Sequence, residues 1–153
     1  LVADGTKLEH PGGFDAVLVD APCTATGTLR RHPDAGWLKG AEDLAKLVAL
    51  QGRLIEAAIR LARPGGRVVF ATCSLEPEEG EARIEEPRPP PDAVGTRHRA
   101  ARAGLVLDPI APGEVAGADT FLAPGGFLRA RPDHWAELGG IDGFFVGRFR
   151  KPG

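Results

Sequence analysis

The sequence predicts an α/β fold built on a parallel sheet, and three features carry this prediction. Two short apolar runs, Val17–Val19 and Val68–Phe70, have the composition of buried parallel strands. A long segment between them repeats its apolar residues at helical spacing. Each run is soon followed by one of the two cysteines, Cys23 and Cys73. Both thiols are therefore expected at strand C-termini, where open α/β sheets place their chemistry.

The first three elements follow from local signals. A strand is predicted over 14–19, after a turn sequence rich in Pro and Gly at 10–13. A helix is predicted over 43–62, and the Arg-Pro-Gly-Gly sequence at 63–66 should end it. The next strand is predicted over 67–72. Two apolar strands joined by a helix are typical of a right-handed βαβ unit.

The second half of the chain carries weaker signals. A helix is predicted over 76–86, with Pro77 and several acidic residues in its first turn. Residues 87–103 are rich in Pro and Arg and lack apolar periodicity, so we expect an irregular surface segment there. Short strands are predicted over 104–108 and 143–149.

Composition bounds the class of protein. The chain has 153 residues, of which 42% are hydrophobic and 26% charged, which fits one globular domain or a large piece of one. The absence of methionine and the opening residues favour a C-terminal fragment of a domain. The formal net charge of −2 gives no overall nucleic-acid signature. No stretch approaches the ~20 apolar residues of a membrane span, and no signal-peptide pattern opens the chain, so we expect a soluble cytoplasmic protein.

The two cysteines have several possible roles. Their separation and the absence of a C-x-x-C pattern argue against a disulfide framework or a zinc site. One disulfide or a pair of inert core thiols remain structural alternatives. Asp20 precedes Cys23 by three residues, and Pro22 stiffens the turn between them. A carboxylate at this strand end is suited to polar interactions with a ligand in a cleft. A strand-end Asp is more commonly a turn or cap residue.

Cys73 has a different local setting. The predicted helix over 76–86 would begin just after it, and the free N–H groups of a helix N-terminus favour the thiolate form of a nearby cysteine. Cys73 is therefore a candidate nucleophile. The acidic residues Glu76, Glu78 and Glu79 would oppose this effect if they point inward.

Four segments together resemble a known family. They are Asp-Ala-Pro-Cys-Thr-Ala-Thr-Gly at 20–27, Arg-Arg-His-Pro-Asp at 30–34, Ala-Thr-Cys-Ser at 71–74 with Pro-Glu-Glu at 77–79, and Gly-Gly-Ile-Asp-Gly-Phe-Phe at 139–145. In this order and with a βαβ unit between the cysteines, they closely resemble the Sun (Fmu, or NOL1/NOP2/Sun) RNA cytosine-5 methyltransferases. The bacterial 16S ribosomal RNA branch is the most similar, given the Arg-Arg-His-Pro-Asp run.

The resemblance implies a fold and an activity. The fold would be the C-terminal part of a Rossmann-like class I methyltransferase sheet, with residues 1–153 as part of one domain. The activity would be methylation of cytosine C5 in ribosomal RNA, with S-adenosyl-L-methionine as cofactor and a covalent cysteine–C6 adduct. The 16S ribosomal RNA would be the partner, and the full-length enzyme would be a monomer.

The resemblance also implies roles for individual residues. Cys73 would be the nucleophile, Cys23 would assist removal of the C5 proton and release of the product, and Asp20 would lie between cofactor and base. Cofactor contacts would come from Asp4, Asp20 and Pro22. The target base must leave its stack to reach the thiols. RNA phosphates would be held by Arg30, Arg31 and His32, which would make the affinity salt-dependent.

The sequence departs from the family in two places. The glycine-rich first cofactor loop and the ribose-binding acid are missing, so we expect the chain alone to bind cofactor poorly and to be inactive. The strand over 14–19 should then be an exposed apolar edge. Residues 87–103 lack the amphipathic helix expected from the family, through divergence or a reading-frame error.

Three alternatives remain open at this point. The first is a transfer-RNA cytosine-5 methyltransferase, and the second is a noncatalytic RNA-binding relic. The third is a dithiol redox protein, although redox pairs usually have two-residue spacing.

Overall fold

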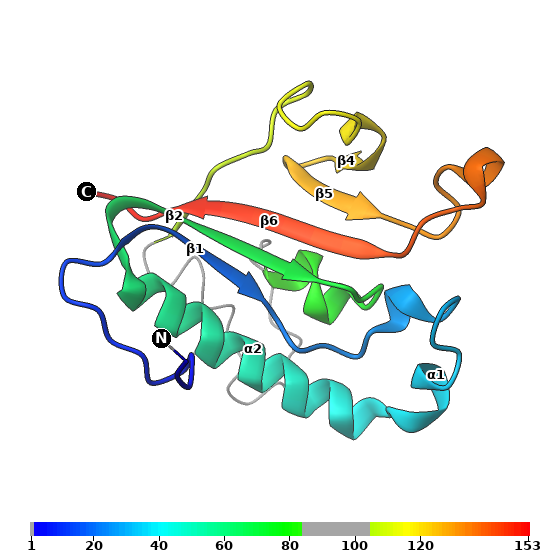
Figure 1. Cartoon of the computed structure of the whole chain (residues 1–153), viewed down its shortest axis with the longest axis horizontal. Helices are drawn as coiled ribbons and strands as arrows, with labels where there is room; N and C mark the ends of the chain where they lie inside the picture. The colour runs from blue at the N-terminus through cyan, green and yellow to red at the C-terminus, as the bar shows by residue number, and fades with distance from the viewer. Residues whose placement is uncertain (1, 84–104) are drawn as a thin grey trace, which may run out of the picture.

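The computed structural model describes residues 2–83 and 105–153, which form one mixed β-sheet with a long helix against it (Figure 1). The strands are β1 (Phe14–Asp20), β2 (Ala62–Thr72), β3 (Val106–Leu107), β4 (Leu122–Ala123), β5 (Phe127–Ala130) and β6 (Phe144–Arg150). The α-helices are α1 (Ala35–Leu38) and α2 (Ala41–Leu61). Five short 3-10 turns are η1 (Thr26–Thr28), η2 (Pro77–Glu79), η3 (Glu81–Arg83), η4 (Asp119–Phe121) and η5 (Ala136–Leu138).

The sheet has the strand order β1-β2-β6-β5-β4, with β3 paired to β6. Strands β1 and β2 are parallel and are joined through α2, which confirms the predicted strand–helix–strand unit. Every other pairing is antiparallel, because β6 runs back beside β2 and continues the sheet toward β5 and β4. The predicted final strand is thus confirmed. The β4–β5 hairpin has no counterpart among the predictions.

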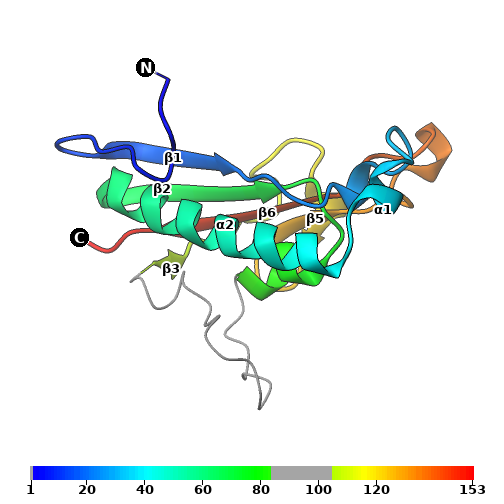
Figure 2. The same ribbon diagram turned by 90° about the horizontal axis from the view of Figure 1, so that it is seen from below.

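Helix α2 packs along β1 and β2 on one face of the sheet (Figure 2). The core between them contains Ile55 and Ala58 from the helix with Val68 and Phe70 from β2, and it continues to Phe145 on β6. On the face of β1 that points away from α2, side chains are exposed to solvent, and Leu18 is 69% exposed. The expectation that β1 is a fully buried strand is therefore wrong, because among the described residues only one face carries a helix. Its position as an apolar edge strand is confirmed.

The start of β2 differs from the predicted turn. The pairing passes from Phe14 opposite Ala62 to Ala16 opposite Arg67, so residues 63–66 bulge out of the ladder. Gly65, with φ of 75°, provides the left-handed conformation that this bulge needs. The Arg-Pro-Gly-Gly sequence does end α2 at Leu61, but the next residue already belongs to the strand.

The predicted helix over 76–86 is wrong over the residues that the structure describes. Two separate 3-10 turns, η2 and η3, stand there instead, divided by Gly80 with φ −128° and ψ −103°. Arg129 lies against Gly80, where an added Cβ atom would be 2.1 Å from its Nη2. Residues 84–104, which include the predicted irregular segment over 87–103, lie outside the described residues.

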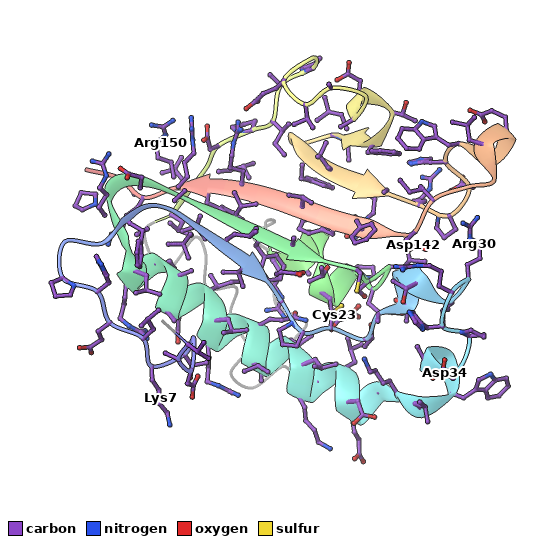
Figure 3. The ribbon with its side chains drawn as sticks, viewed as in Figure 1. Lys7, Cys23, Arg30, Asp34, Asp142 and Arg150 are labelled. Atoms are coloured by element: carbon purple, nitrogen blue, oxygen red, sulfur yellow. The ribbon has the colours of Figure 1, made fainter. Side chains whose placement is uncertain are left out.

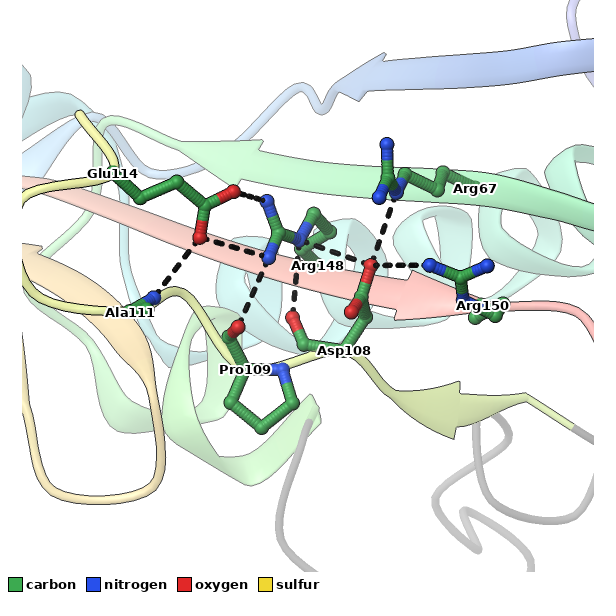
Figure 4. Close-up of polar contacts among 7 residues, drawn as sticks. All are labelled: Arg67, Asp108, Pro109, Ala111, Glu114, Arg148 and Arg150. Carbon is green, nitrogen blue, oxygen red and sulfur yellow. Dashed lines mark hydrogen bonds and ion pairs between the residues drawn. The ribbon is translucent and has the colours of Figure 1, made fainter.

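A group of charged side chains fastens the end of the sheet away from the cysteines (Figure 4). Arg148 on β6 forms an ion pair with Glu114 and another with Asp108, at 3.2 Å. Asp108 also lies 3.1 Å from Arg67 on β2 and 3.8 Å from Arg150 on β6. These contacts hold the segment after β3 against the sheet.

Candidate active site

The two cysteines meet at the C-terminal ends of the parallel strands, as predicted. Beyond Asp20, the N–H of Ala21 still donates to the carbonyl of Ala71 at 2.9 Å, which keeps the two chains together past the strand ends. The Sγ atoms of Cys23 and Cys73 then lie 3.4 Å apart. Both cysteines are free, and a disulfide would need about 2.05 Å between the sulfurs. Figure 3 shows Cys23 at this end of β1 and β2.

The two thiols have different surroundings. Cys23 is buried, with 7% of its surface exposed, whereas Cys73 is half-buried. The pKa of the Cys23 thiol is raised to about 12, mainly by burial and also by its hydrogen bond with Cys73, while the backbone N–H of Ala25 acts against both. At neutral pH Cys23 therefore keeps its proton. In the contact between the two sulfurs, either thiol can be the donor.

The helix N-terminus expected beside Cys73 does not exist. The residues after it form the three-residue turn η2, which is too short to align peptide dipoles as an α-helix does. The prediction that a helix N-terminus stabilises the Cys73 thiolate is therefore wrong. Of the three acidic residues considered, Glu79 is the one that points inward, with 0% exposure.

Hydrogen bonds connect the loop that carries Cys23 to the segment around Cys73 and to the segment that precedes β6. The Lys39 ammonium donates to the carbonyl of Cys23 at 2.7 Å. The N–H of Gly27 donates to the carbonyl of Cys73 at 3.0 Å, and the N–H of Gly143 donates to the carbonyl of Gly27 at 2.7 Å. A Cβ atom on Gly27 would lie 2.1 Å from the Gly143 carbonyl oxygen, so only glycine fits. Three of the four resemblance segments are thus held in direct contact.

Asp20 and Pro22 are both exposed beside the thiol pair. The carbonyl of Pro22 accepts a hydrogen bond from the side-chain amide of Gln51 on α2, at 3.0 Å. Asp4 is exposed as well, and its carboxylate accepts hydrogen bonds from the N–H and hydroxyl of Thr6, at 2.9 and 2.7 Å. These bonds lower the pKa of Asp4 and form a local turn. A cofactor role for Asp4 stays a prediction.

The basic residues at 30–32 lie on the same end of the molecule, and two of them have partners within the chain. Arg30 donates to the carbonyl of Gly139, and Arg31 forms an ion pair with Asp142. Figure 3 labels Arg30 and Asp142, the latter on the segment that leads into the start of β6. His32 is exposed. Within the described residues, these contacts join the loop after Cys23 to the segment that leads into β6.

Four polar residues behind the thiols were missed by the sequence reasoning as site residues. They are Thr24, Gln51, Ser74 and Glu79, and all four are buried. A signal existed for Gln51, because it lies four residues from both Leu47 and Ile55 and so interrupts the apolar stripe of α2. For Glu79, the sequence predicts only a place among the acidic residues in the first turn of a helix.

Other kinds of site are not found in residues 2–83 and 105–153. No group of three or more His, Cys, Asp or Glu side chains in these ranges could hold a metal ion. No helix in the same ranges is long and apolar enough to cross a membrane.

The fold and the thiol pair define a class, that of methyltransferases with a partial Rossmann-like class I sheet. The sequence matches the family of 16S rRNA methyltransferases RsmB/F over residues 1–94, more than half of the chain. The chain therefore belongs to this family, which confirms the resemblance to its bacterial branch.

Individual relatives agree with this assignment. The ribosomal RNA small subunit methyltransferase B of Pasteurella multocida is 49% identical over 73 residues, which are 48% of this chain and 16% of the relative. The protein of the same name from Vibrio cholerae is 47% identical over 72 residues, which are 47% of this chain and 17% of the relative. The matched segment is thus a small part of each curated relative.

Solved structures support the fold. The crystal structure of NSun6 from Pyrococcus horikoshii with SFG superimposes with a TM-score of 0.73 at 26% identity, covering 99% of this chain and 34% of that one. A methyltransferase homolog protein from Pyrococcus horikoshii gives a TM-score of 0.61 at 32% identity, covering 91% of this chain and 39% of that one.

Proposed function

We propose that this chain carries the two-thiol part of an active site that methylates C5 of cytosine in 16S ribosomal RNA, in the cytoplasm, with S-adenosylmethionine as methyl donor. The observation that carries the proposal is the 3.4 Å contact between Cys23 and Cys73 at the ends of two parallel strands. Membership of the RsmB/F family supports the substrate. The chain covers 16% of the Pasteurella multocida relative, so further parts of such an enzyme are needed for the complete reaction.

The different surroundings of the thiols support a division of labour. A nucleophile must be present as thiolate, and Cys23, whose pKa is raised to about 12, is poorly suited to that role. Cys73 is half-buried, and the protonated Cys23 thiol lies 3.4 Å away, within reach to donate to a thiolate formed at Cys73 during the reaction. We therefore assign the attack on cytosine C6 to Cys73 and the later proton transfer to Cys23.

The proposed methylation of cytosine conserves protons and electrons at each step. Cys73 loses its proton to solvent and its sulfur forms a bond to C6, while the C5=C6 electron pair moves to C5. The bound cofactor would supply the methyl group to the C5 electron pair, with cleavage of its methyl–sulfonium bond and departure of S-adenosylhomocysteine. Cys23 then passes its thiol proton to the departing sulfur of Cys73 and accepts the C5 proton, as the C5=C6 bond re-forms. Both thiols are regenerated, and one proton is released overall.

The residues beside the thiols fit the proposed cofactor. Asp20 offers an exposed carboxylate at the C-terminal end of β1, which suits the ammonium group of a methionine moiety. Pro22 borders the same place. SFG, named with the NSun6 structure, is an analogue of S-adenosylmethionine, which supports this cofactor. The Asp4 carboxylate remains partly exposed beside its Thr6 contacts and is proposed as a second contact.

A chimera tests the proposal. The chain replaces the corresponding segment of the Pasteurella multocida relative and is incubated with labelled S-adenosylmethionine and 16S ribosomal RNA. We expect Cys73→Ala to abolish methyl transfer, and Cys23→Ala to accumulate a covalent protein–RNA adduct seen as a shifted band on a denaturing gel. Full methyl transfer by Cys73→Ala would refute the proposal. A noncatalytic RNA-binding relic predicts that RNA binding is retained without any transfer, and transfer to transfer RNA alone would indicate the other substrate.

The basic loop is proposed as an RNA contact. If Arg30 or His32 neutralises a phosphate, its replacement by Ala should reduce the slope of log affinity against log salt by about one. Arg31→Ala serves as a comparison, because Arg31 is already paired with Asp142. An unchanged slope in all three variants would exclude phosphate contacts at this loop.

A further inference from the structure

Glu79 is buried at the centre of the polar residues behind the thiols. Its two carboxylate oxygens accept hydrogen bonds from the backbone N–H of Thr24, at 3.1 and 3.0 Å. The Thr24 hydroxyl donates to one of them at 2.5 Å, and the Gln51 amide donates to the other at 2.9 Å. Its own carbonyl accepts a bond from the Thr72 hydroxyl at 3.1 Å, which anchors Glu79 to β2. The carboxyl oxygens of this side chain, with 0% exposure, thus accept hydrogen bonds from three donor groups, as a buried polar group requires.

The carboxylate determines the direction of a chain of hydroxyl groups. Because the Thr24 hydroxyl donates to Glu79, it accepts from the Ser74 hydroxyl, 3.1 Å away. The Ser74 oxygen in turn accepts from the N–H of Glu76 at 3.0 Å and lies 3.3 Å from the Thr26 hydroxyl. The Thr26 oxygen accepts from the N–H of Leu75 at 2.9 Å. Each hydroxyl proton therefore has one defined acceptor.

This chain of hydrogen bonds connects the residues directly after the two cysteines. Thr24 follows Cys23 and Ser74 follows Cys73, and both are almost fully buried, with 4% and 0% exposure. The relative position of the two thiols is thus coupled to Glu79 through Thr24 and Ser74. Neutral replacements break the pattern, since a Gln amide at this position would direct N–H groups at another donor.

We propose that Glu79 is a positioning residue that, through Thr24 and Ser74, holds the sulfurs of Cys23 and Cys73 at the separation needed for proton transfer between them. The catalytic meaning of this separation rests on the function proposed above. The geometric part does not, because the separation of two thiols can be measured without any substrate.

The rate of disulfide formation measures that separation. The full chain is oxidised with diamide, which takes two electrons and two protons from the thiols. The rate of disulfide formation is divided by the rate of iodoacetamide alkylation at Cys73, and this quotient is the disulfide ratio. Thr24→Val removes the hydroxyl at nearly constant volume, and Thr24→Ser retains it. A displacement of about 1 Å can cost on the order of a hundredfold in such a reaction. We expect Thr24→Val to lower the ratio at least about tenfold and Thr24→Ser to leave it within about twofold.

Controls separate positioning from general loss of stability. Phe149→Leu weakens the core at the far end of β6, where Phe149 pairs with Val68. It should lower the melting temperature and leave the ratio unchanged. Glu79→Gln should lower the ratio, and its effect should not add to that of Thr24→Val, because both act through one network. An unchanged ratio in Thr24→Val, or an equal loss in Phe149→Leu, overturns the proposal.

The chimera distinguishes this inference from the proposed function. If Thr24→Val lowers the disulfide ratio and also slows release of the RNA adduct, while Thr24→Ser does neither, Glu79 positions the thiols for catalysis. If the unmutated chimera transfers no methyl group but the ratio still falls, the proposed function fails and the geometric role of Glu79 stands. If methyl transfer is normal in Thr24→Val, the catalytic part of the inference is wrong.

Discussion

The raised pKa of Cys23 leads to a prediction that does not depend on any substrate. Its value moves from 9.0 to about 12, mainly because the thiol is buried. At pH 8 this shift lowers the thiolate fraction of Cys23 from about one tenth to about one ten-thousandth. Because only the thiolate reacts, the rate of alkylation should fall with it. The Cys73→Ser variant leaves Cys23 as the only cysteine and keeps a polar partner beside it.

The measurement is the rate of iodoacetamide alkylation from pH 7 to 12, followed by mass spectrometry. Poor access slows the reaction at every pH, whereas a raised pKa moves the midpoint of the profile, so the midpoint is the decisive quantity. We expect a midpoint at least one unit above that of the same variant unfolded in guanidinium chloride, because the hydroxyl replaces only part of the contact with Cys73. Equal midpoints in the folded and unfolded chains would refute the reasoning.

The same shift affects stability at high pH. The unfolded chain releases the Cys23 proton near pH 9 and the folded chain retains it to about pH 12. The contribution to the free energy of unfolding is therefore complete below pH 9 and is lost as the pH rises toward 12. Cys23→Ala should lose less stability over this range than the unmutated chain does.

Three further predictions concern stability and are tested by thermal and urea unfolding. Gly27→Ala should destabilise the chain by more than about 2 kcal/mol, because its Cβ would meet a backbone oxygen at 2.1 Å. Gly52→Ala in α2 should stabilise the chain by up to about 1 kcal/mol, because outside the nearby backbone of the helix no atom lies within 4 Å of the added Cβ. Phe145→Ala should cost about 3–5 kcal/mol, since this ring is fully buried; a cost near zero would contradict its place in the core. The pKa of Glu114 is lowered from 4.5 to about 2 by its hydrogen bond with an arginine, so its contribution to stability is present above pH 4.5 and lost as the pH falls toward 2. Glu114→Gln should lose less stability over that acid range than the unmutated chain, and equal losses would contradict the pairing.

The meeting of the two thiols could be predicted from sequence because it depends on local signals. Two apolar runs and one helical segment define a strand–helix–strand unit, and parallel strands end at the same edge of a sheet. The register then places Asp20 opposite Ala71, close to both cysteines. The separation of 3.4 Å could not be predicted, since it depends on loop contacts between residues about fifty positions apart.

The error at 76–86 has a definite physical cause. Local composition favoured a helix, with Pro77 and acidic residues in the first turn. Arg129, from β5, packs beside Gly80 and donates to the carbonyl of Ser74 at 2.6 Å, and it forms an ion pair with Glu81. These contacts come from a strand that the sequence reasoning did not predict. Tertiary contacts therefore override the helical preference of this segment.

The difference between the two cysteines also originates outside their local sequences. Both follow short apolar strands, and both precede a hydroxyl residue. Glu79, however, binds the backbone N–H of Thr24 directly and reaches Ser74 only through the Thr24 hydroxyl. The Cys23 loop, bonded to this side chain, is buried, and burial raises the pKa of its thiol, whereas Cys73 is half-buried. Two similar motifs thus acquire different surroundings, because the buried side chain of Glu79 bonds directly to only one of them.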